Sequence, residues 1–339
     1  MSAPVSVAVI GLGRMGCQHA ENLAWRVPGA RLALVVDADQ GRAREQAARL
    51  GEVAWSAHLE DALHDVAIQA VVIAAPTPAH ADMVEAAIAA GKDLFCEKPL
   101  TLDRARSAEL SARAAARGVR LQVGFHRRFD PDYREVKRQV ESGAVGRIYL
   151  FRESCRDMRP PSFEYIENSG GIFADVTLHD FDVARWLVGE VAEVTAVAGA
   201  VSDPRFLAAH DVDNAVVVLR FAGGALGVID NSRVAGYGYE CSAELVGERK
   251  TLRIGGRRSH QRLDVEELSG GWARRGYVTD FVERFHRAYL AEIEAFVAAV
   301  RDDRMPEVTG EDATCALDLA EAARRSWQER RPIRIPEDE

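Results

Sequence analysis

Several features that would assign a protein to a specialised class are missing from this sequence. The chain has only five cysteines, Cys17, Cys96, Cys155, Cys241 and Cys315, and no two of them are spaced as C-x-x-C. Scattered cysteines argue against a disulfide framework and against a zinc site, so we expect reduced thiols and no metal. Internal repeats and low-complexity tracts are missing as well.

Long apolar runs are also scarce. None of them approaches the roughly 20 residues that a membrane-spanning helix requires. Residues 1–10 lack a basic segment followed by an apolar run, which a secretory signal would need. We therefore expect a cytoplasmic protein that does not interact with a membrane.

Positive charge is outweighed by negative charge. The chain has 43 lysines and arginines against 52 acidic residues, a formal net charge of −9. This balance argues against non-specific binding to nucleic acid or to an anionic membrane. With 47% apolar and 28% charged residues the chain is an ordinary globular sequence. Its 339 residues exceed what one core usually organises, so we expect two domains.

The first 123 residues alternate between strand and helix patterns. A β-branched run at residues 5–10 precedes a glycine loop at residues 11–16, with the sequence G-L-G-R-M-G. A helical pattern follows, and a second apolar run at residues 32–36 ends in Asp37. This order is typical of a dinucleotide-binding βαβ unit. The alternative is a glycine loop with a purely structural role.

Each glycine of the loop has a physical role in the cofactor interpretation. Gly11 allows the tight turn, Gly13 lets the backbone approach a pyrophosphate, and Gly16 lets the helix pack on the strands. Arg14 and Met15 then begin the helix whose N-terminus faces the anion.

An acidic residue at the end of the second strand indicates which dinucleotide binds. Asp37 would accept hydrogen bonds from the ribose hydroxyls and repel a 2′-phosphate, which favours NAD over NADP. Arg42 and Arg44 lie close by in the sequence and weigh in the other direction.

Two further strands of this domain lead into loops at the same predicted edge of the sheet. Residues 70–74 run into Ala75, Pro76, Thr77, Pro78, Ala79 and His80, and residues 93–96 are followed by Glu97, Lys98 and Pro99. A lysine at this edge would lie beside a nicotinamide, where its ammonium can stabilise a developing alkoxide. Alternatively, Lys98 is merely solvated and the proline loop is an ordinary turn. The Lys98–Pro99 bond can be cis or trans.

A polar stripe is predicted on a helix over residues 170–182. The helix follows Gly170 and Gly171 and places Asp175, His179 and Asp182 on one face. A histidine between carboxylates is suited to proton transfer near neutral pH. The alternative is a polar face that simply meets water.

Strand patterns dominate after Gly124. We expect strands at 147–156, 191–198, 212–221, 225–232, 239–246, 251–254 and 262–267, with a hairpin turn at 222–224, and helices at 280–301 and 310–328. These patterns predict an α/β protein with a Rossmann domain at 1–123 and an α+β domain at 124–339, built on a large, mostly antiparallel open sheet. The C-terminal helices can pack back on the first domain. The outer face of such a sheet needs a cover, which predicts a homo-oligomer.

Taken together, these motifs resemble a known family over essentially the whole chain. The glycine loop with Asp37, the proline loop, Glu97-Lys98-Pro99, the run at 127–131 and the segment 170–182 occur in the order of the Gfo/Idh/MocA oxidoreductases. Within that family the stretches 164–166, 228–233, 237–239 and 288–306 are most similar to inositol 2-dehydrogenases.

The resemblance implies specific roles for residues of this chain. It implies a catalytic trio of Lys98, Asp175 and His179, and homotetramers assembled through the C-terminal sheets. The implied NAD-binding residues are Gly11, Gly13, Arg14, Met15, Gly16, Asp37, Ala75, Pro76, Thr77, His80, Glu97 and Lys98. The implied substrate-binding residues are Lys98, His126, Arg127, Asp157, Asp175, His179, Asp182, Tyr237 and Tyr239.

The resulting prediction is NAD-dependent oxidation of one secondary hydroxyl of a cyclic polyol, with an inositol as substrate. His179 would remove the hydroxyl proton, Lys98 would stabilise the oxyanion, and Asp175 would orient His179 and share its proton. One alternative is a dehydrogenase of scyllo-inositol, or of a glucose-like or levoglucosan-like sugar. A more remote one is a non-catalytic NAD-binding sensor. His126 replaces the expected asparagine or methionine, and it either faces substrate or packs under the neighbouring loop.

Overall fold

The structure, a computed structural model of the chain, describes residues 3–255 and 278–335. The chain forms two compact units. The first comprises Met1–Phe129 and Arg287–Cys315, and the second comprises Asp130–His286 and Ala316–Glu339. The predicted strand at 262–267 lies outside the described residues. In the described part of the chain, no helix has the length and apolarity needed to cross a membrane.

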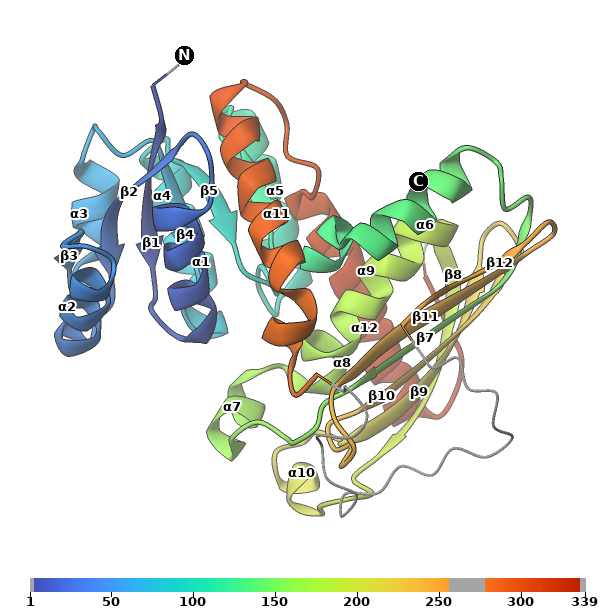
Figure 1. Cartoon of the computed structure of the whole chain (residues 1–339). Helices are drawn as coiled ribbons and strands as arrows, with labels where there is room; N and C mark the ends of the chain where they lie inside the picture. The colour runs from blue at the N-terminus through green and yellow to red at the C-terminus, as the bar shows by residue number, and fades with distance from the viewer. Residues whose placement is uncertain (1–2, 256–277, 336–339) are drawn as a thin grey trace. The chain divides into compact units, whose positions relative to one another are not determined.

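The first unit contains a six-stranded parallel sheet in the order β3-β2-β1-β4-β5-β6 (Figure 1). Its strands are β1 (Val5–Ile10), β2 (Ala30–Val36), β3 (Ala54–Ser56), β4 (Ala70–Ile73), β5 (Asp93–Cys96) and β6 (Leu121–Val123). Every residue of β1 and β4 is buried, which explains their continuous apolar sequences. The strand order reverses between β1 and β4, and in open α/β sheets ligands bind at such a reversal.

Helices connect these strands and pack against the sheet. They are α1 (Arg14–Trp25), α2 (Gln40–Arg49), α3 (Leu59–His64), η1 (Thr77–Ala79), α4 (His80–Ala89), α5 (Arg104–Ala116) and η2 (His126–Phe129). Asp39 and Asp103 cap α2 and α5 by accepting backbone N–H groups of the first turn. The later part of α11 (Phe281–Arg301) places Ile293 and Phe296 in the same core as Val7.

The second unit is built on a seven-stranded sheet in the order β12-β11-β7-β10-β9-β8-β13. Its strands are β7 (Ile148–Arg156), β8 (Val191–Gly199), β9 (Asn214–Phe221), β10 (Leu226–Ser232), β11 (Glu240–Gly247), β12 (Thr251–Ile254) and β13 (Ile333–Arg334). All neighbours pair antiparallel except β10 with β7. The predicted hairpin joins β9 to β10, with Gly224 at a positive φ of 86°. The predicted fold class is confirmed.

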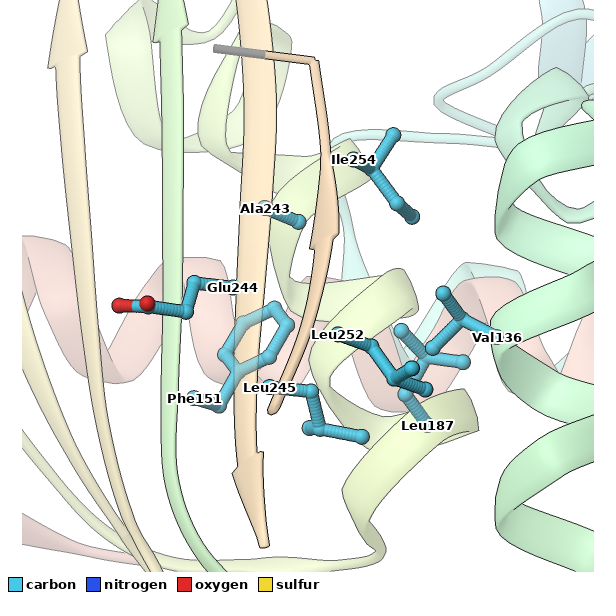
Figure 2. A pocket seen from close by; sticks show the side chains of 8 residues that line it. All are labelled: Val136, Phe151, Leu187, Ala243, Glu244, Leu245, Leu252 and Ile254. Atoms are coloured by element: carbon cyan, nitrogen blue, oxygen red, sulfur yellow. The ribbon is translucent and has the colours of Figure 1, made fainter. Parts of the chain in front are cut away.

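Helices cover one face of this sheet. They are α6 (Pro131–Glu141), α9 (Thr177–Val188) and the end of α12 (Gly310–Glu329). The same unit also contains the short helices α7 (Phe163–Asn168), α8 (Gly171–Asp175) and α10 (Arg205–Ala208) and the start of α11. A small apolar hollow lies where α6 and α9 meet β7, β11 and β12 (Figure 2). Glu244 points away from this hollow, which therefore reflects packing and contains no candidate catalytic group.

The opposite face of the sheet carries exposed apolar side chains. Val197 pairs with Val216 across β8 and β9, and both are exposed. Val218 and Leu226 are exposed on the same face. The predicted open sheet face therefore exists within this unit.

Candidate active site

The glycine loop of the first unit is shaped by close backbone contacts. Gly11 has a φ of +86°, and a Cβ there would lie 2.6 Å from the backbone of Ala75. A Cβ on Gly16 would lie 1.7 Å from the carbonyl oxygen of Gly11. A Cβ on Gly13 would meet no atom within 4 Å. Gly11 and Gly16 are thus required for packing, whereas Gly13 leaves the face of the loop open to a ligand.

The helix after this loop has an N-terminus suited to an anion. Helix α1 begins at Arg14, its first turn contains no acidic residue, and no side chain among the described residues caps it. A helix N-terminus of this kind can bind an anionic ligand such as a pyrophosphate. The geometry of the loop and helix fits a dinucleotide.

Asp37 links the glycine loop to the end of β2. Its Oδ2 accepts the backbone N–H of Leu12 at 2.7 Å, and its Oδ1 accepts that of Asp39 at 2.9 Å. The Arg42 guanidinium lies 3.2 Å from Oδ2. The carboxylate is fixed at the strand end where a ribose would lie in this fold.

The proline loop is tied to the strand end that carries Lys98. The two ring nitrogens of His80 lie 2.8 Å from the carbonyl oxygens of Pro99 and Ala75. His80 is almost fully buried, so it holds the two loops together. The Lys98–Pro99 peptide bond is cis.

A buried acidic cluster, which the sequence did not predict, lies next to Lys98 in the chain. Nε2 of His19 on α1 is 2.6 Å from Oε1 of Glu97. Glu292 of α11 lies within the same group, and its fully buried carboxyl has no hydrogen-bond partner among the described residues. Burial and the neighbouring Glu97 raise the pKa of Glu292 well above its usual value. The ring of His126 stacks on Tyr289, with centroids 4.4 Å apart.

The predicted polar stripe lies on two consecutive helices of the second unit. Gly170 and Gly171 adopt left-handed backbone angles at the start of α8, as their positions at a helix start suggest. Asp175 ends α8, and His179 and Asp182 belong to α9. The prediction of one uninterrupted helix is wrong, because Val176 separates the two helices. Val176 keeps right-handed angles, so about one helical turn still separates Asp175 from His179.

Helix α9 is fixed to the sheet by a neighbour of the stripe. Asn231 of β10 donates from Nδ2 to Oδ2 of Asp180 at 2.7 Å, and its Oδ1 accepts the hydroxyl of Thr177 at 2.6 Å. Asp180, to which the sequence assigned no chemical role, is fully buried and anchors the helix.

Asp175 lies within a network of charged and polar groups. Tyr165 donates its hydroxyl to Oδ1 of Asp175 at 2.9 Å. Arg233, which has no exposed side-chain surface, donates to Oδ2 at 3.0 Å and to Asp211 at 3.3 Å. The charge of Asp175 raises the pKa of Tyr165. Arg233 and Asp211 belong to no local sequence motif of the site, because their relation to Asp175 exists only in the folded chain.

The other predicted substrate ligands have diverse surroundings. Tyr239 is buried, with its hydroxyl 3.7 Å from the Cys155 sulfur. Tyr237 donates to Glu240 and lies 3.1 Å from Arg156, and burial together with Glu240 raises its pKa to about 12. Asp157 bonds through its backbone to Ser232 and Ala235. Their contact with a substrate stays a prediction.

The remaining predicted site residues divide between the two units. Lys98 is half-buried and Arg127 is almost fully buried, and both belong to the first unit. Asp175, His179 and the almost fully buried Asp182 belong to the second. The catalytic and ligand roles of all these residues stay predictions.

The fold, the glycine loop and the fixed Asp37 together define a dinucleotide-binding protein of the Rossmann class. Residues 5–125 match the oxidoreductase family with an NAD-binding Rossmann fold, and residues 137–335 match its C-terminal alpha/beta domain. The chain belongs to the Gfo/Idh/MocA oxidoreductase family, as the sequence motifs predicted. The predicted cofactor class, NAD, is confirmed with it.

Full-length relatives support this assignment. The chain is 40% identical to scyllo-inositol 2-dehydrogenase (NAD(+)) of Bacillus subtilis, over 99% of this chain and 97% of that one. It is 39% identical to myo-inositol 2-dehydrogenase of Thermotoga maritima, over 98% of each chain. A Lactobacillus casei scyllo-inositol dehydrogenase, solved with NAD(H) and scyllo-inositol, has a TM-score of 0.87 at 28% identity and covers 98% of this chain and 99% of its own. The predicted likeness to inositol 2-dehydrogenases is confirmed.

Proposed function

We propose that this protein oxidises one secondary hydroxyl of an inositol to a ketone with NAD. The observation that carries the proposal is the full-length relation, near 40% identity, to proteins named inositol 2-dehydrogenases. Retention of Lys98, Asp175 and His179 adds support, because a non-catalytic sensor has no need of a proton-transfer group.

In the proposed reaction each catalytic residue has a separate role. His179 accepts the hydroxyl proton as the carbonyl forms, and the Lys98 ammonium stabilises the negative charge that develops on the oxygen. Asp175 orients His179. NAD, when bound, supplies the hydride acceptor. Gly11, Gly13, Gly16 and the start of α1 would hold its pyrophosphate, and Asp37 its ribose.

Substrate discrimination would come from polar side chains that the wrong isomer leaves unpaired. The family resemblance assigns this role to Arg127, Asp182 and the tyrosines Tyr237 and Tyr239. Asp182 is almost fully buried. A substrate hydroxyl in the wrong orientation would lose its hydrogen bond to such a carboxylate, which is costly.

A substrate panel tests the proposal. We expect NADH formation with myo-inositol or scyllo-inositol at a kcat/KM at least about tenfold above that for glucose or levoglucosan, since a missing polar contact costs that much. The two inositols differ in the orientation of one hydroxyl, so their ratio identifies the preferred isomer. Lys98→Met serves as the inactive control. Faster turnover of a sugar than of both inositols would overturn the substrate, and NAD binding without turnover of any of them would indicate a sensor.

The proposal includes a homotetramer in the cytoplasm. The exposed apolar residues Val197, Val216, Val218 and Leu226 on the open sheet face support burial of that face against another subunit. All five cysteines lie in described residues and are free thiols, which fits a reducing compartment.

A further inference from the structure

Asp175 is held by a buried arginine from a distant part of the sequence. We propose that Arg233 is a positioning residue that keeps Asp175 ionised and stationary, so that Asp175 acts on His179 as a fixed negative charge and not as a proton acceptor. The proposal rests on the dehydrogenase function proposed above, and it refines the expected sharing of a proton between Asp175 and His179.

The side chain of Arg233 is buried and paired with two carboxylates. Its side chain has no exposed surface, and its guanidinium lies between Oδ2 of Asp175 at 3.0 Å and Oδ2 of Asp211 at 3.3 Å. A buried charge persists only when it is paired, since removing one partner leaves the other without compensation. Burial opposes the charge of Arg233, but the two carboxylates outweigh it and raise its pKa.

Both carboxylate oxygens of Asp175 accept hydrogen bonds. Oδ1 accepts the hydroxyl of Tyr165 at 2.9 Å, and Oδ2 accepts Nη1 of Arg233. Hydrogen bonds from two donors stabilise the carboxylate form over the protonated form. A carboxylate held in this way has a low affinity for the proton of His179.

Helix α8 is held at both of its ends. Oδ1 of Asp211 accepts the backbone N–H of Ile172 near the start of α8, at 2.8 Å, while Arg233 holds Asp175 at its end. The backbone N–H of Arg233 donates to the Asp213 carbonyl at 2.8 Å, directly after β10. Arg233 therefore connects the five residues of α8 to the central sheet.

The charged groups around Asp175 come from several elements. Asp211 precedes β9, Asp157 follows β7, Tyr165 lies on α7, and His179 lies on α9. Burial raises the pKa of Asp211, although Arg233 and the N–H of Ile172 oppose this rise. Arg233 pairs directly with both Asp175 and Asp211. Its removal would leave these carboxylates to repel each other.

The mechanistic consequence concerns the proton that His179 accepts. When the imidazole takes the hydroxyl proton it becomes positively charged, and the fixed carboxylate of Asp175 stabilises that charge. Because Arg233 and Tyr165 each donate to one oxygen of Asp175, they lower the basicity of this carboxylate, and the proton stays on His179 until it leaves for solvent or for another base.

A stability experiment tests the ionised state of Asp175 without any turnover. Arg233→Met, Asp175→Asn and the double variant are compared with the wild type by thermal denaturation between about pH 5.5 and about pH 8.5. We expect the midpoint of Arg233→Met to fall with rising pH more steeply than that of the wild type. Without Arg233 the folded state favours protonated Asp175, so the pKa of this carboxyl is higher in the folded state than in the unfolded state. The free energy of unfolding therefore decreases as the pH rises and the proton dissociates. Asp175→Asn in the double variant should remove most of this excess slope.

The matched control is Arg205→Met, which removes an exposed ion pair with Asp203 in the same unit. Its midpoint should follow the wild type at every pH. If Arg233→Met fails to fold at high pH, the double variant and Arg233→Lys provide the same comparison. An Arg233→Met midpoint that parallels the wild type across the pH range would overturn the proposal.

A kinetic experiment tests the positioning role. We expect Arg233→Met to lower kcat on the order of 100-fold, the scale that misplacement of a catalytic group can cost. The acid limb of the plot of kcat against pH should move to higher pH in Arg233→Met, while the KM for NAD should change less than about twofold. Arg233→Lys keeps the positive charge and should restore much of kcat. A lower kcat with an unmoved acid limb would indicate a merely structural role and overturn the proposal. Absence of turnover in the wild type would reject the proposed function, and the stability experiment would still decide the role of Arg233.

Discussion

The side chain of Asp37 combines a structural contact with a predicted cofactor contact. It accepts the Leu12 N–H at 2.7 Å and lies 3.2 Å from the Arg42 guanidinium. We expect Asp37→Ala to weaken NADH binding about tenfold, because a hydrogen bond to a charged group contributes that much. The variant should also relax discrimination against NADPH, since Arg42 is released to meet a 2′-phosphate. Fluorescence titration with both reduced cofactors measures this ratio.

Two further variants test whether the change in cofactor preference is due to the charge of Asp37. Asp37→Asn keeps an acceptor oxygen but removes the charge, so it should shift the NADH to NADPH ratio with a smaller loss of NADH affinity. Asp82→Asn, at an exposed acid in the first turn of α4, should leave both affinities unchanged. A ratio that stays at the wild-type value in both Asp37 variants would show that another residue selects the cofactor.

The site could be predicted from the sequence only where its residues are close in the chain. The glycine loop, Lys98 and the stripe from Asp175 are local patterns with recognisable spacing. Arg233 is 58 positions from Asp175, and His19 is 78 positions from Glu97. Such pairs depend on strand order and sheet register, which no local pattern reports.

At the scale of secondary-structure elements, α11 places a carboxyl in the core of the first unit. Glu292 has no exposed surface, and burial followed by the Glu97 charge raises its pKa well above the usual value. A carboxyl with a raised folded-state pKa stabilises the protein fully below its unfolded pKa of about 4.3, and this stability is lost as the pH rises. We expect Glu292→Gln to flatten that decline, since the amide stays neutral. Thermal midpoints measured from about pH 5 to about pH 9 test this.

Glu294→Gln is the matched control for this experiment. Glu294 lies on the same helix and is partly exposed, so its replacement should preserve the wild-type slope of midpoint against pH. Equal slopes for Glu292→Gln and the wild type would mean that the buried carboxyl is already charged in the folded protein.

The main helices and strands could be predicted because glycine and proline mark their ends and because their periodicity is clear. The predicted strands at 5–10, 93–96 and 251–254 agree with β1, β5 and β12. The short elements β3, α7 and α10 are among those that were not predicted. Segments of three to six residues contain too few side chains to establish a period. The break between α8 and α9 at Val176 was not predicted, because Val176 keeps helical backbone angles.

At the scale of the whole molecule, the predicted boundary fell after residue 123, with the allowance that C-terminal helices pack back on the first domain, and the first compact unit extends to Phe129. Arg287–Cys315 belongs to the compact unit formed by Met1–Phe129. Apolar residues of α11, such as Ile293 and Phe296, complete the core of the parallel sheet. Linear sequence patterns predict helices well, but they do not indicate which core a helix joins when both faces carry apolar residues.

The open face of the seven-stranded sheet is the surface through which we expect subunits to assemble. Val216 is exposed and pairs with exposed Val197, so a charge placed there is solvated in an isolated subunit. If two subunits bury this face, the same charge must be desolvated without a partner. We therefore expect light scattering after size-exclusion chromatography to give four chain masses for the wild type and a smaller assembly for Val216→Glu. Arg138→Glu, at an exposed position on α6 of the helix-covered side, should keep the wild-type mass. A Val216→Glu protein with the wild-type mass at every concentration would show that the assembly, if one forms, uses another surface.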